Sequence, residues 1–391
     1  MELMKKSLEM HEEHKGKMEI KSKVPIEDIY DLSLAYSPGV AAPCIEIEKD
    51  RSKVYDYTIK GNTVAIVTDG TAVLGLGDIG PEAALPVMEG KALLLKRFSN
   101  VDAYPICLDT KDVDEIVKIV KAISPTFGAI NLEDISAPRC FEIEERLRKE
   151  CNIPVFHDDQ HGTAIVVSAG LENALKIVKK KKEDIKIVIN GAGAAGIAIL
   201  KLLLQIGYKH IIMCDSSGVI YSGRPNGMNP IKEQIAKLTN ENNIQGKLDD
   251  ALVGADVFIG VSVANLLSQS HIQSMNQDPI VFALANPNPE ITFENAKEWG
   301  VRIIGTGRSD YPNQVNNMLA FPGIFRGALN VRAKDINEAM KLAAVKSIAS
   351  IVSEEELCED LIIPRSLDER VAIVVSEAVA KAAIESGVSQ I

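Results

Sequence analysis

Two pairs of adjacent acidic residues have the spacing of a metal site. Glu133-Asp134 follows the apolar run GAINL, Asp158-Asp159 follows IPVFH, and Asp109 ends a third run, AYPICL. The carboxyl ends of parallel strands meet at one edge of a sheet, so we expect these acids to lie close together. Carboxylate oxygens are the hard ligands that Mg²⁺ and Mn²⁺ prefer. Because neighbouring side chains of a strand point to opposite faces, each pair can converge only where its strand has ended.

Helix capping or a salt bridge is the alternative role for each acid, and for a lone aspartate it is the expected one. Two acidic pairs at equivalent strand ends favour a metal instead. The same region holds His157 and His161 in HDDQH, which have the i, i+4 spacing of a helical zinc site. IPVF is strand-like, however, and an aspartate follows His157. Each histidine is therefore expected to hydrogen-bond to backbone or to a carboxylate.

The segment IKIVINGAGAAGIAILKLLLQIGYKHIIMCD has the order of parts that binds a dinucleotide. A strand leads into Gly-x-Gly-x-x-Gly, a helix opens there, and an aspartate follows the next strand. The glycines suit a tight turn, backbone contact with a pyrophosphate and close helix packing, while the helix N-terminus attracts the phosphates. The alternative is a glycine turn with no bound dinucleotide. The predicted cofactor-binding residues of this unit are Gly191, Gly193, Ala194, Ala195, Gly196 and Asp215.

The choice between NAD and NADP depends on Asp215. Its carboxylate is placed to accept from the ribose hydroxyls and to repel a 2′-phosphate, which predicts NAD. The following loop contains Ser216, Ser217 and Arg224, which have the hydrogen-bonding groups and the charge to hold that phosphate. NADP therefore stays open as the second cofactor.

A second GxGxxG, Gly75 to Gly80, is interpreted as a decoy. The lead-in NTVAIVTDGTAVLGLGD predicts a hairpin turning at Asp69-Gly70 rather than a single strand, and Pro81 opens the next helix. A loop of this kind facing a crevice could still touch substrate or cofactor.

Short apolar runs alternate with amphipathic helices from residue 103 onward, which predicts an α/β protein. We expect an N-terminal α/β domain with a short parallel sheet over residues 1–160. A Rossmann-type dinucleotide-binding domain with C-terminal helices is expected over residues 161–391. The lysine run at residues 179–182 is expected to be a solvated link.

Composition excludes several classes of partner. The net charge of −11 opposes binding to nucleic acid or to an anionic membrane, and no run of 18 apolar residues occurs. Six scattered cysteines without CxxC spacing and an N-terminus lacking an apolar segment predict a cytoplasmic protein.

Seven segments, taken in order, resemble the malic enzymes: LAYSPGVAAPC, VTDGTAVLGLGDIGPEAALPVMEGKALLLK, INLEDI, VFHDDQHGTA, INGAGAAG, ALANPNPE and NQVNNMLAFPGIFRGA. They extend from about residue 33 to 330, and the chain length is similar to that of the compact bacterial-type members, which lack a phosphotransacetylase-like domain. The resemblance implies oxidative decarboxylation of malate to pyruvate and CO₂ with NAD or NADP and Mg²⁺ or Mn²⁺. It also implies a homodimer.

The resemblance assigns roles that spacing alone does not. Tyr36 matches the family's general acid and Lys91 its general base, although by spacing alone they would be a surface anchor and a surface lysine. Asp158 matches the acid that orients the lysine. Asn286 and Asn317 match substrate- and nicotinamide-side asparagines. The residues that match the metal ligands are Glu133, Asp134 and Asp159.

One difference concerns Ala72, which stands where longer members have an arginine. The substrate carboxylate must then rely on the metal, Asn286, Asn317 and the backbone N–H groups of residues 37–40. To act as a base near neutral pH, Lys91 needs a pKa lowered from about 10.4 toward 7, and Asp158 opposes that change. The alternatives are another metal-dependent 2-hydroxy-acid dehydrogenase, a zinc hydrolase using HDDQH, and a non-catalytic dinucleotide sensor.

Overall fold

The computed structural model describes residues 2–73 and 75–391 and contains two separate sheets. The first sheet is parallel throughout, in the strand order β2-β1-β3-β4. Its strands are β1 (Thr63–Thr68), β2 (Asp102–Cys107), β3 (Ala129–Leu132) and β4 (Val155–His157). The predicted hairpin at Asp69-Gly70 is wrong. Residues 70–73 and 75–80 contain only an isolated bridge between Val73 and Gly77, because β1 is already paired on both sides, by β2 and β3.

The second sheet has the order β10-β9-β8-β5-β6-β7, with only β7 antiparallel to its neighbour. Its strands are β5 (Lys186–Asn190), β6 (His210–Asp215), β7 (Gly218–Val219), β8 (Val257–Gly260), β9 (Ile280–Ala283) and β10 (Ile303–Thr306). Strands β8, β9 and β10 are buried at every residue and β5 at all but its first, as expected of parallel strands covered by helices. The α/β class, with a Rossmann-like second unit, is confirmed.

Sixteen α-helices occur in the described residues. In the N-terminal part they are α1 (Glu2–His14), α2 (Ile29–Ala35), α3 (Ala41–Lys49), α4 (Val54–Tyr57), α5 (Pro81–Ser99), α6 (Val113–Ile123) and α7 (Arg139–Glu150). The others are α8 (Asp158–Val178), α9 (Ala194–Ile206), α10 (Pro230–Leu238), α11 (Leu248–Leu252), α12 (Gln269–Ser274), α13 (Phe293–Glu298), α14 (Phe321–Asn330), α15 (Glu338–Ile351) and α16 (Arg370–Glu385). None of the helices in residues 2–73 and 75–391 is both long and apolar enough to cross a membrane.

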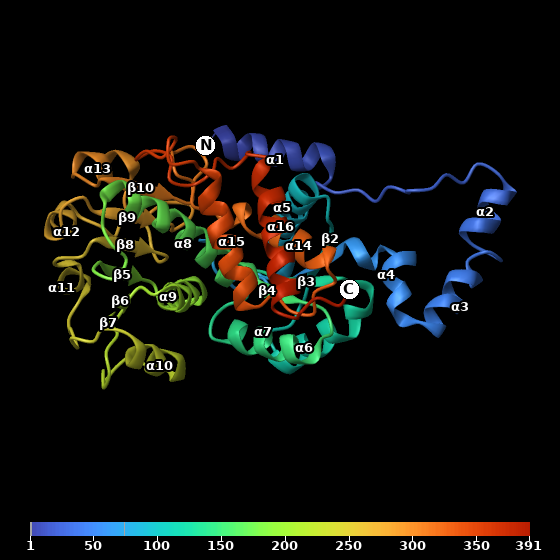
Figure 1. The fold of residues 1–391 in the computed structure, drawn as a ribbon, viewed down its shortest axis with the longest axis horizontal. Coiled ribbons are helices and arrows are strands. Elements are labelled where there is room, and N and C mark those ends of the chain that lie inside the picture. The colour runs from blue at the N-terminus through green and yellow to red at the C-terminus, as the bar shows by residue number, and fades with distance from the viewer. Residues whose placement is uncertain (1, 74) are drawn as a thin grey trace.

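One buried hydrophobic cluster extends across both sheets, and each sheet also has a cluster of its own. Helix α8 connects the last strand of the first sheet to the first strand of the second, and Ile66 of β1 and Ile187 of β5 belong to the same buried cluster as Phe325 of α14. The C-terminal helices α14 and α16 pack against α5 of the N-terminal part (Figure 1). A domain boundary near residue 160 stays a prediction.

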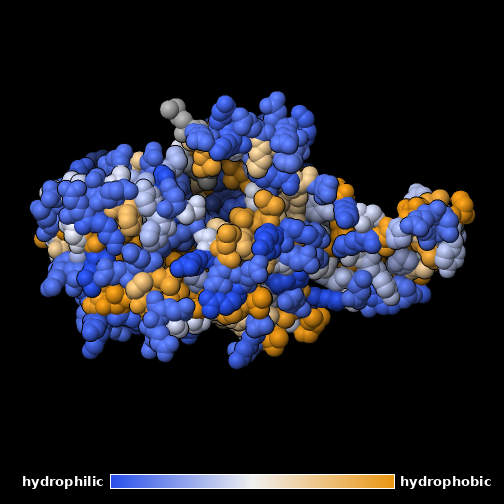
Figure 2. Space-filling view, turned by 90° about the horizontal axis from the view of Figure 1, so that it is seen from above, coloured by the Kyte–Doolittle hydropathy of each residue, from blue (hydrophilic) through white to orange (hydrophobic). Residues whose placement is uncertain are grey.

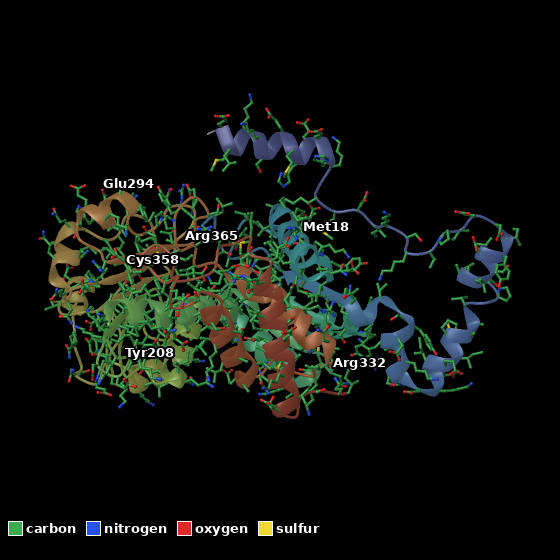
Figure 3. The ribbon with its side chains drawn as sticks, turned by 45° about the horizontal axis from the view of Figure 1, so that its top comes forward. Met18, Tyr208, Glu294, Arg332, Cys358 and Arg365 are labelled. Carbon is green, nitrogen blue, oxygen red and sulfur yellow. The ribbon has the colours of Figure 1, made fainter. Side chains whose placement is uncertain are left out.

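An arm formed by residues 20–50, with α2 and α3, projects from the body (Figure 1). Neither helix has a buried residue, and apolar side chains such as Ile29 (77% exposed) and Tyr30 (69% exposed) face outward. Figure 2 shows hydrophobic surface at the tip of this arm. The arm begins just after Met18, and Figure 3 labels Met18 and Arg332. Immediately after the arm, Asp56 forms an ion pair with Arg332, whose guanidinium lies over the ring of Tyr55.

Candidate active site

The two acidic pairs converge at the carboxyl end of the first sheet. Ligand oxygens of Glu133, Asp134 and Asp159 all lie within 4.8 Å of one another. Asp134 adopts a left-handed backbone conformation (φ 53°), so the strand has ended there, and its N–H donates to Asp159 Oδ2 at 2.7 Å. Asp109, which follows the edge strand β2, is exposed and outside this group.

This donor set fits a divalent cation. Glu133 is 1% exposed and Asp134 is 5% exposed, so their charges are removed from water and repel one another. Three carboxylates at this spacing leave room for water and substrate oxygens in an octahedral shell. Glu133, Asp134 and Asp159 are therefore the candidate metal ligands.

Lys91 extends from α5 into the acidic cluster. Its Nζ lies 2.5 Å from Asp158 Oδ2 and 3.0 Å from Glu133 Oε1, and it lies 4.7 Å from the centre of the Phe321 ring. Burial alone would lower the pKa of this amine. The attraction of Asp158, Glu133 and Asp159 outweighs burial and holds the pKa of Lys91 above its usual value. Lys91 is thus a cation shared between two carboxylates.

The same buried environment changes the pKa of the carboxylates that contact Lys91. Burial, with repulsion from Asp159, raises the pKa of Glu133 well above its usual value despite the attraction of Lys91. Burial also raises the pKa of Asp158, against the opposing contact with Lys91. The cluster as a whole lacks positive charge, which a metal would supply.

Gly162 is a residue that sequence reasoning missed. A Cβ built there would lie 1.9 Å from Asp158 Oδ1 and 3.1 Å from Asn317 Cβ. The glycine in α8 therefore leaves space for the carboxylate that holds Lys91. The same contact places Asn317, in the 3₁₀-helix η4 (Asn317–Leu319), beside Asp158.

Asn286 lies in the loop after β9, at the junction of the two units. A Cβ on Gly75 would lie 1.9 Å from the Asn286 carbonyl oxygen, so the glycine-rich loop of residues 75–80 meets the Asn286 loop directly. That loop is not a dinucleotide turn, because Gly80 is the N-cap of α5 and Pro81 begins the helix. The backbone N–H of Ala72 donates to Asp134 O, which places the same segment beside the acidic cluster.

The dinucleotide motif has the predicted local geometry. Gly191 follows β5 with φ 120°, and Gly193 is the N-cap of α9, with Ala194 and Ala195 in the first turn. A Cβ on Gly193 would meet no atom within 4 Å, which leaves the backbone open to a pyrophosphate. A Cβ on Gly196 would lie 1.8 Å from Gly191 O, so this glycine permits close packing of the helix.

Asp215, at the end of β6, is paired with two cations. Arg224 donates to both of its oxygens at 2.8 and 2.6 Å, and Lys232 of α10 donates to Oδ2 at 2.6 Å. Burial would raise the pKa of Asp215, but the bonds from Arg224 and Lys232 lower it to about 2. The proximity of Lys232, 17 residues along the chain, has no signal in the sequence pattern.

Tyr36 does not meet Lys91 within one chain. It is 68% exposed and caps the C-terminus of α2, which lies at the outer part of the arm (Figure 1). Its hydroxyl has no hydrogen-bond partner in residues 2–73 and 75–391. Tyr36 therefore lies apart from the candidate residues that the structure brings together, which are Lys91, Glu133, Asp134, Asp158, Asp159 and Asn317.

The HDDQH histidines do not form a zinc site. His161 lies 2.6 Å from Glu144 through Nε2 and 3.3 Å from Lys341 through Nδ1, so both ring nitrogens are engaged and the expected carboxylate contact is confirmed. For His157 that expectation is wrong. Its buried ring has no hydrogen-bond partner among the described residues, and its Nδ1 lies 3.8 Å from Asp159 Oδ2, beyond hydrogen-bond distance.

Comparison with models of protein families shows which family the chain belongs to. Residues 15–148 match the N-terminal domain of malic enzymes, and residues 160–384 match the malic enzyme NAD-binding domain. The chain belongs to the malic enzyme family. It is 65% identical, over its whole length and 95% of the relative's, to a bifunctional malic/malolactic enzyme of Bacillus subtilis. It is 50% identical to the NADP-dependent malic enzyme of Escherichia coli, with 99% of this chain covering 53% of that protein.

Solved malic enzyme structures have the same fold. The NAD-dependent malic enzyme of Thermotoga maritima superposes with a TM-score of 0.92 at 50% identity, covering 95% of this chain and 98% of that one. The malic enzyme of Pyrococcus horikoshii superposes with a TM-score of 0.94 at 50% identity, covering 99% and 92%.

Replacing Asp159 by asparagine is expected to weaken Mn²⁺ binding by about tenfold or more, because a ligand charge is removed. The melting temperature should change little. Electron paramagnetic resonance of free Mn²⁺ measures the affinity. Asp109→Asn, an exposed acid at the end of β2, is the matched control and should bind Mn²⁺ like the parent. Equal affinity in all three proteins would contradict the metal assignment.

Gly162→Ala is expected to displace Asp158 and to lower kcat for malate oxidation by about tenfold or more, because misplaced catalytic groups lose orientation. Gly170→Ala on the same helix is the control, since its Cβ would meet nothing closer than 3.5 Å. Steady-state kinetics and circular dichroism separate lost activity from lost folding. A folded Gly162→Ala protein with parental kcat would show that Asp158 needs no such space.

Proposed function

We propose that this malic enzyme catalyses the oxidative decarboxylation of malate to pyruvate and CO₂, dependent on a divalent cation and on NAD or NADP. The observation that carries the proposal is the position of Lys91 Nζ, within 3.0 Å of both Asp158 and Glu133 at a three-carboxylate cluster. A buried amine beside metal ligands suits removal of a proton from a metal-bound hydroxyl. We place the reaction in the cytoplasm, where reducing conditions suit the six free cysteines.

The candidate site residues have separate roles in this reaction. Glu133, Asp134 and Asp159 hold Mg²⁺ or Mn²⁺, and the turn at Gly191, Gly193 and Gly196 holds the pyrophosphate of the dinucleotide. When bound, the cation polarises the C2 oxygen of malate and the nicotinamide accepts hydride from C2. Asn286 and Asn317 orient the substrate and the nicotinamide where the two units meet.

Lys91 takes the proton of the C2 hydroxyl. In the structure the surrounding carboxylates favour its ammonium form. A cation held by Glu133 and Asp159 would offset their charges and so lower the pKa of Lys91. Asp158 keeps the amine in place through the 2.5 Å contact. Loss of the C4 carboxylate as CO₂ then leaves the enolate of pyruvate, which needs a proton at C3.

Tyr36 supplies that proton across a homodimer. Within one chain the tyrosine lies on the projecting arm, away from the cluster. The arm exposes Ile29, Tyr30 and Leu34 at 58% or more, an apolar surface that a second copy would cover. A two-fold pair of chains lets each arm bring Tyr36 to the Lys91 of the other.

Both NAD and NADP are accepted. The predicted preference for NAD rested on a free Asp215 carboxylate, whereas Arg224 and Lys232 neutralise it and leave one positive charge in excess. A 2′-phosphate then meets Lys232 rather than an unpaired acid. Malic enzymes named for each cofactor occur among relatives at 48–60% identity.

A second activity is conversion of malate to lactate. The relative at 65% identity is named a bifunctional malic/malolactic enzyme, and it matches all of this chain. In that reaction pyruvate would be reduced by the same dinucleotide, so no net reduction of NAD accumulates. Lactate assayed beside pyruvate, with catalytic NAD, decides between one activity and two.

The proposed function predicts malate-dependent reduction of NAD or NADP with Mn²⁺, accompanied by pyruvate and CO₂ in equal amounts. Lys91→Ala should lose this activity by about a thousandfold, because proton transfer by a positioned base contributes up to that order, and should still bind NAD. Lys96→Ala, on the exposed side of the same helix, is the control. Oxidation of malate at a parental rate by Lys91→Ala would contradict the assignment.

The shared site predicts complementation between two inactive proteins. Tyr36→Phe and Lys91→Ala homodimers should each be nearly inactive. Mixed dimers contain one site with both native residues if Tyr36 acts across the interface, which restores about a quarter of parental activity in an equal random mixture. A tyrosine acting on its own chain gives no recovery, and that result would exclude the proposed arrangement.

Lys232→Gln is expected to lower kcat/KM for NADP by about tenfold, since one charged phosphate contact is lost, while NAD changes far less. Lys237→Gln, an exposed lysine on the same helix α10, is the control. An equal effect on the two cofactors would show that Lys232 does not meet the 2′-phosphate.

A further inference from the structure

A cleft of about 650 Å³ lies between α7, α8, α9 and α15, apart from the acidic cluster. The positions of α7, α9 and α15, which line the cleft, can be followed in Figure 1. Helix α7 belongs to the first matched domain and α9 to the second, so the cleft separates the two units. Its volume is in the range of small-molecule sites.

The walls of the cleft carry an excess of positive charge. Four acids line it, and each has a partner there. Glu145 pairs with Lys149, Asp335 with Arg148, Glu338 with Lys341, and Glu144 hydrogen-bonds to His161.

Two further lysines, Lys201 of α9 and Lys334, line the cleft. Neither side chain has a hydrogen bond or an ion pair in the described part of the chain, although the charge of Lys201, after that of Lys149, helps to lower the pKa of Glu145. Five basic residues therefore face four acids in a chain of net charge −11. An anion is the ligand that this imbalance attracts.

One wall of the cleft is apolar. Its apolar lining residues are Ile197, Ala198 and Leu202 of α9 and Phe141 of α7. An anion with a short hydrocarbon part would place its charges on Lys201 and Lys334 and its carbon atoms on this wall. The match is therefore to a small organic dianion.

Glu144, on the cleft wall, is connected to the candidate metal site. Gln160 Nε2 donates to Glu144 Oε2 at 3.1 Å, and His161 contacts Oε1 at 2.6 Å. Both donors follow Asp159 directly in the first turn of α8. Glu144 itself lies on α7, the helix that follows the loop of Glu133 and Asp134. This carboxylate therefore joins the two segments that carry the candidate metal ligands.

We infer that the cleft between α7 and α9 binds a small dianion, and that its occupancy alters metal affinity through Glu144. A ligand in the cleft would contact Lys201 of the second unit and α7 of the first. It would therefore fix the separation of the two units. A shift of α7 against α8 changes the distance between Glu133 and Asp159. By linkage, the metal must change the affinity for the dianion by the same factor. The inference does not depend on the proposed reaction, because binding is measured without malate.

Calorimetry with succinate and, separately, inorganic phosphate tests the site and distinguishes a carboxylate ligand from a phosphate ligand. The full chain is saturated with NAD and kept in EDTA, so that neither the metal nor the pyrophosphate site takes the probe. We expect one of the two to bind with a Kd of about 1 mM or tighter. Lys201→Glu with Lys334→Glu should weaken it at least tenfold. The control pair Lys209→Glu with Lys237→Glu makes the same change in net charge outside the cleft and should leave binding unchanged.

Binding of neither probe, or equal loss in both double variants, would overturn the site. The connection is tested by the Mn²⁺ affinity of the parent with and without the bound probe, after subtraction of the probe's own Mn²⁺ binding. We expect at least a threefold change in the parent and none in Glu144→Gln. Binding of the probe with an unchanged Mn²⁺ affinity in the parent would overturn the connection.

Discussion

Lys91 lies among buried carboxylates, and the active-site half of the molecule is arranged around their charges. The amine contacts Asp158 and Glu133, while Glu133 is also one of three acids with the spacing of a cation site. Isolated buried charges are costly, whereas charges with close partners are tolerated. Each acid is placed by the end of a buried strand, and the amine arrives from α5 on the neighbouring connection. The same set of charges would therefore hold the metal and tune the base.

Under the proposed function, this arrangement would let Lys91 act as a base only when the cation is bound. With the carboxylates free, they favour the ammonium form and raise its pKa. A cation held by Glu133 would offset the charges that favour the ammonium form, so the proposed base and the proposed metal site would be coupled through Glu133. Tyr36, the proposed general acid, lies on an exposed arm, so under the proposed function it would come from a second chain. A single chain would then hold the rest of the proposed site, and a second copy that covers the apolar arm would complete it.

Much of the fold and of the candidate site was predictable from local sequence patterns. Acids after apolar runs, the glycine turn after a strand and the alternation of strands and helices are local signals, and the structure brings Glu133, Asp134 and Asp159 together as expected. The hairpin at Asp69-Gly70 was wrong because the turn residues are local, whereas the pairing of β1 with β2 and β3 is not. Gly162 and Lys232 were missed for the same reason. Their contacts with Asp158 and Asp215 depend on packing that no sequence spacing encodes.

Competition between Lys91 and the cation for the same carboxylates is the central claim, and Mn²⁺ binding to Lys91→Met tests it most directly. In the absence of metal, the buried carboxylates of the variant lack the ammonium group that partners them in the parent. Its melting temperature should therefore fall by several degrees. Because no ammonium group opposes the cation, Mn²⁺ should bind the variant more tightly than the parent and restore most of the lost stability. The contradicting result is a Lys91→Met protein that is as stable as the parent in EDTA and binds Mn²⁺ no more tightly. It would show that the lysine and the metal do not share these carboxylates.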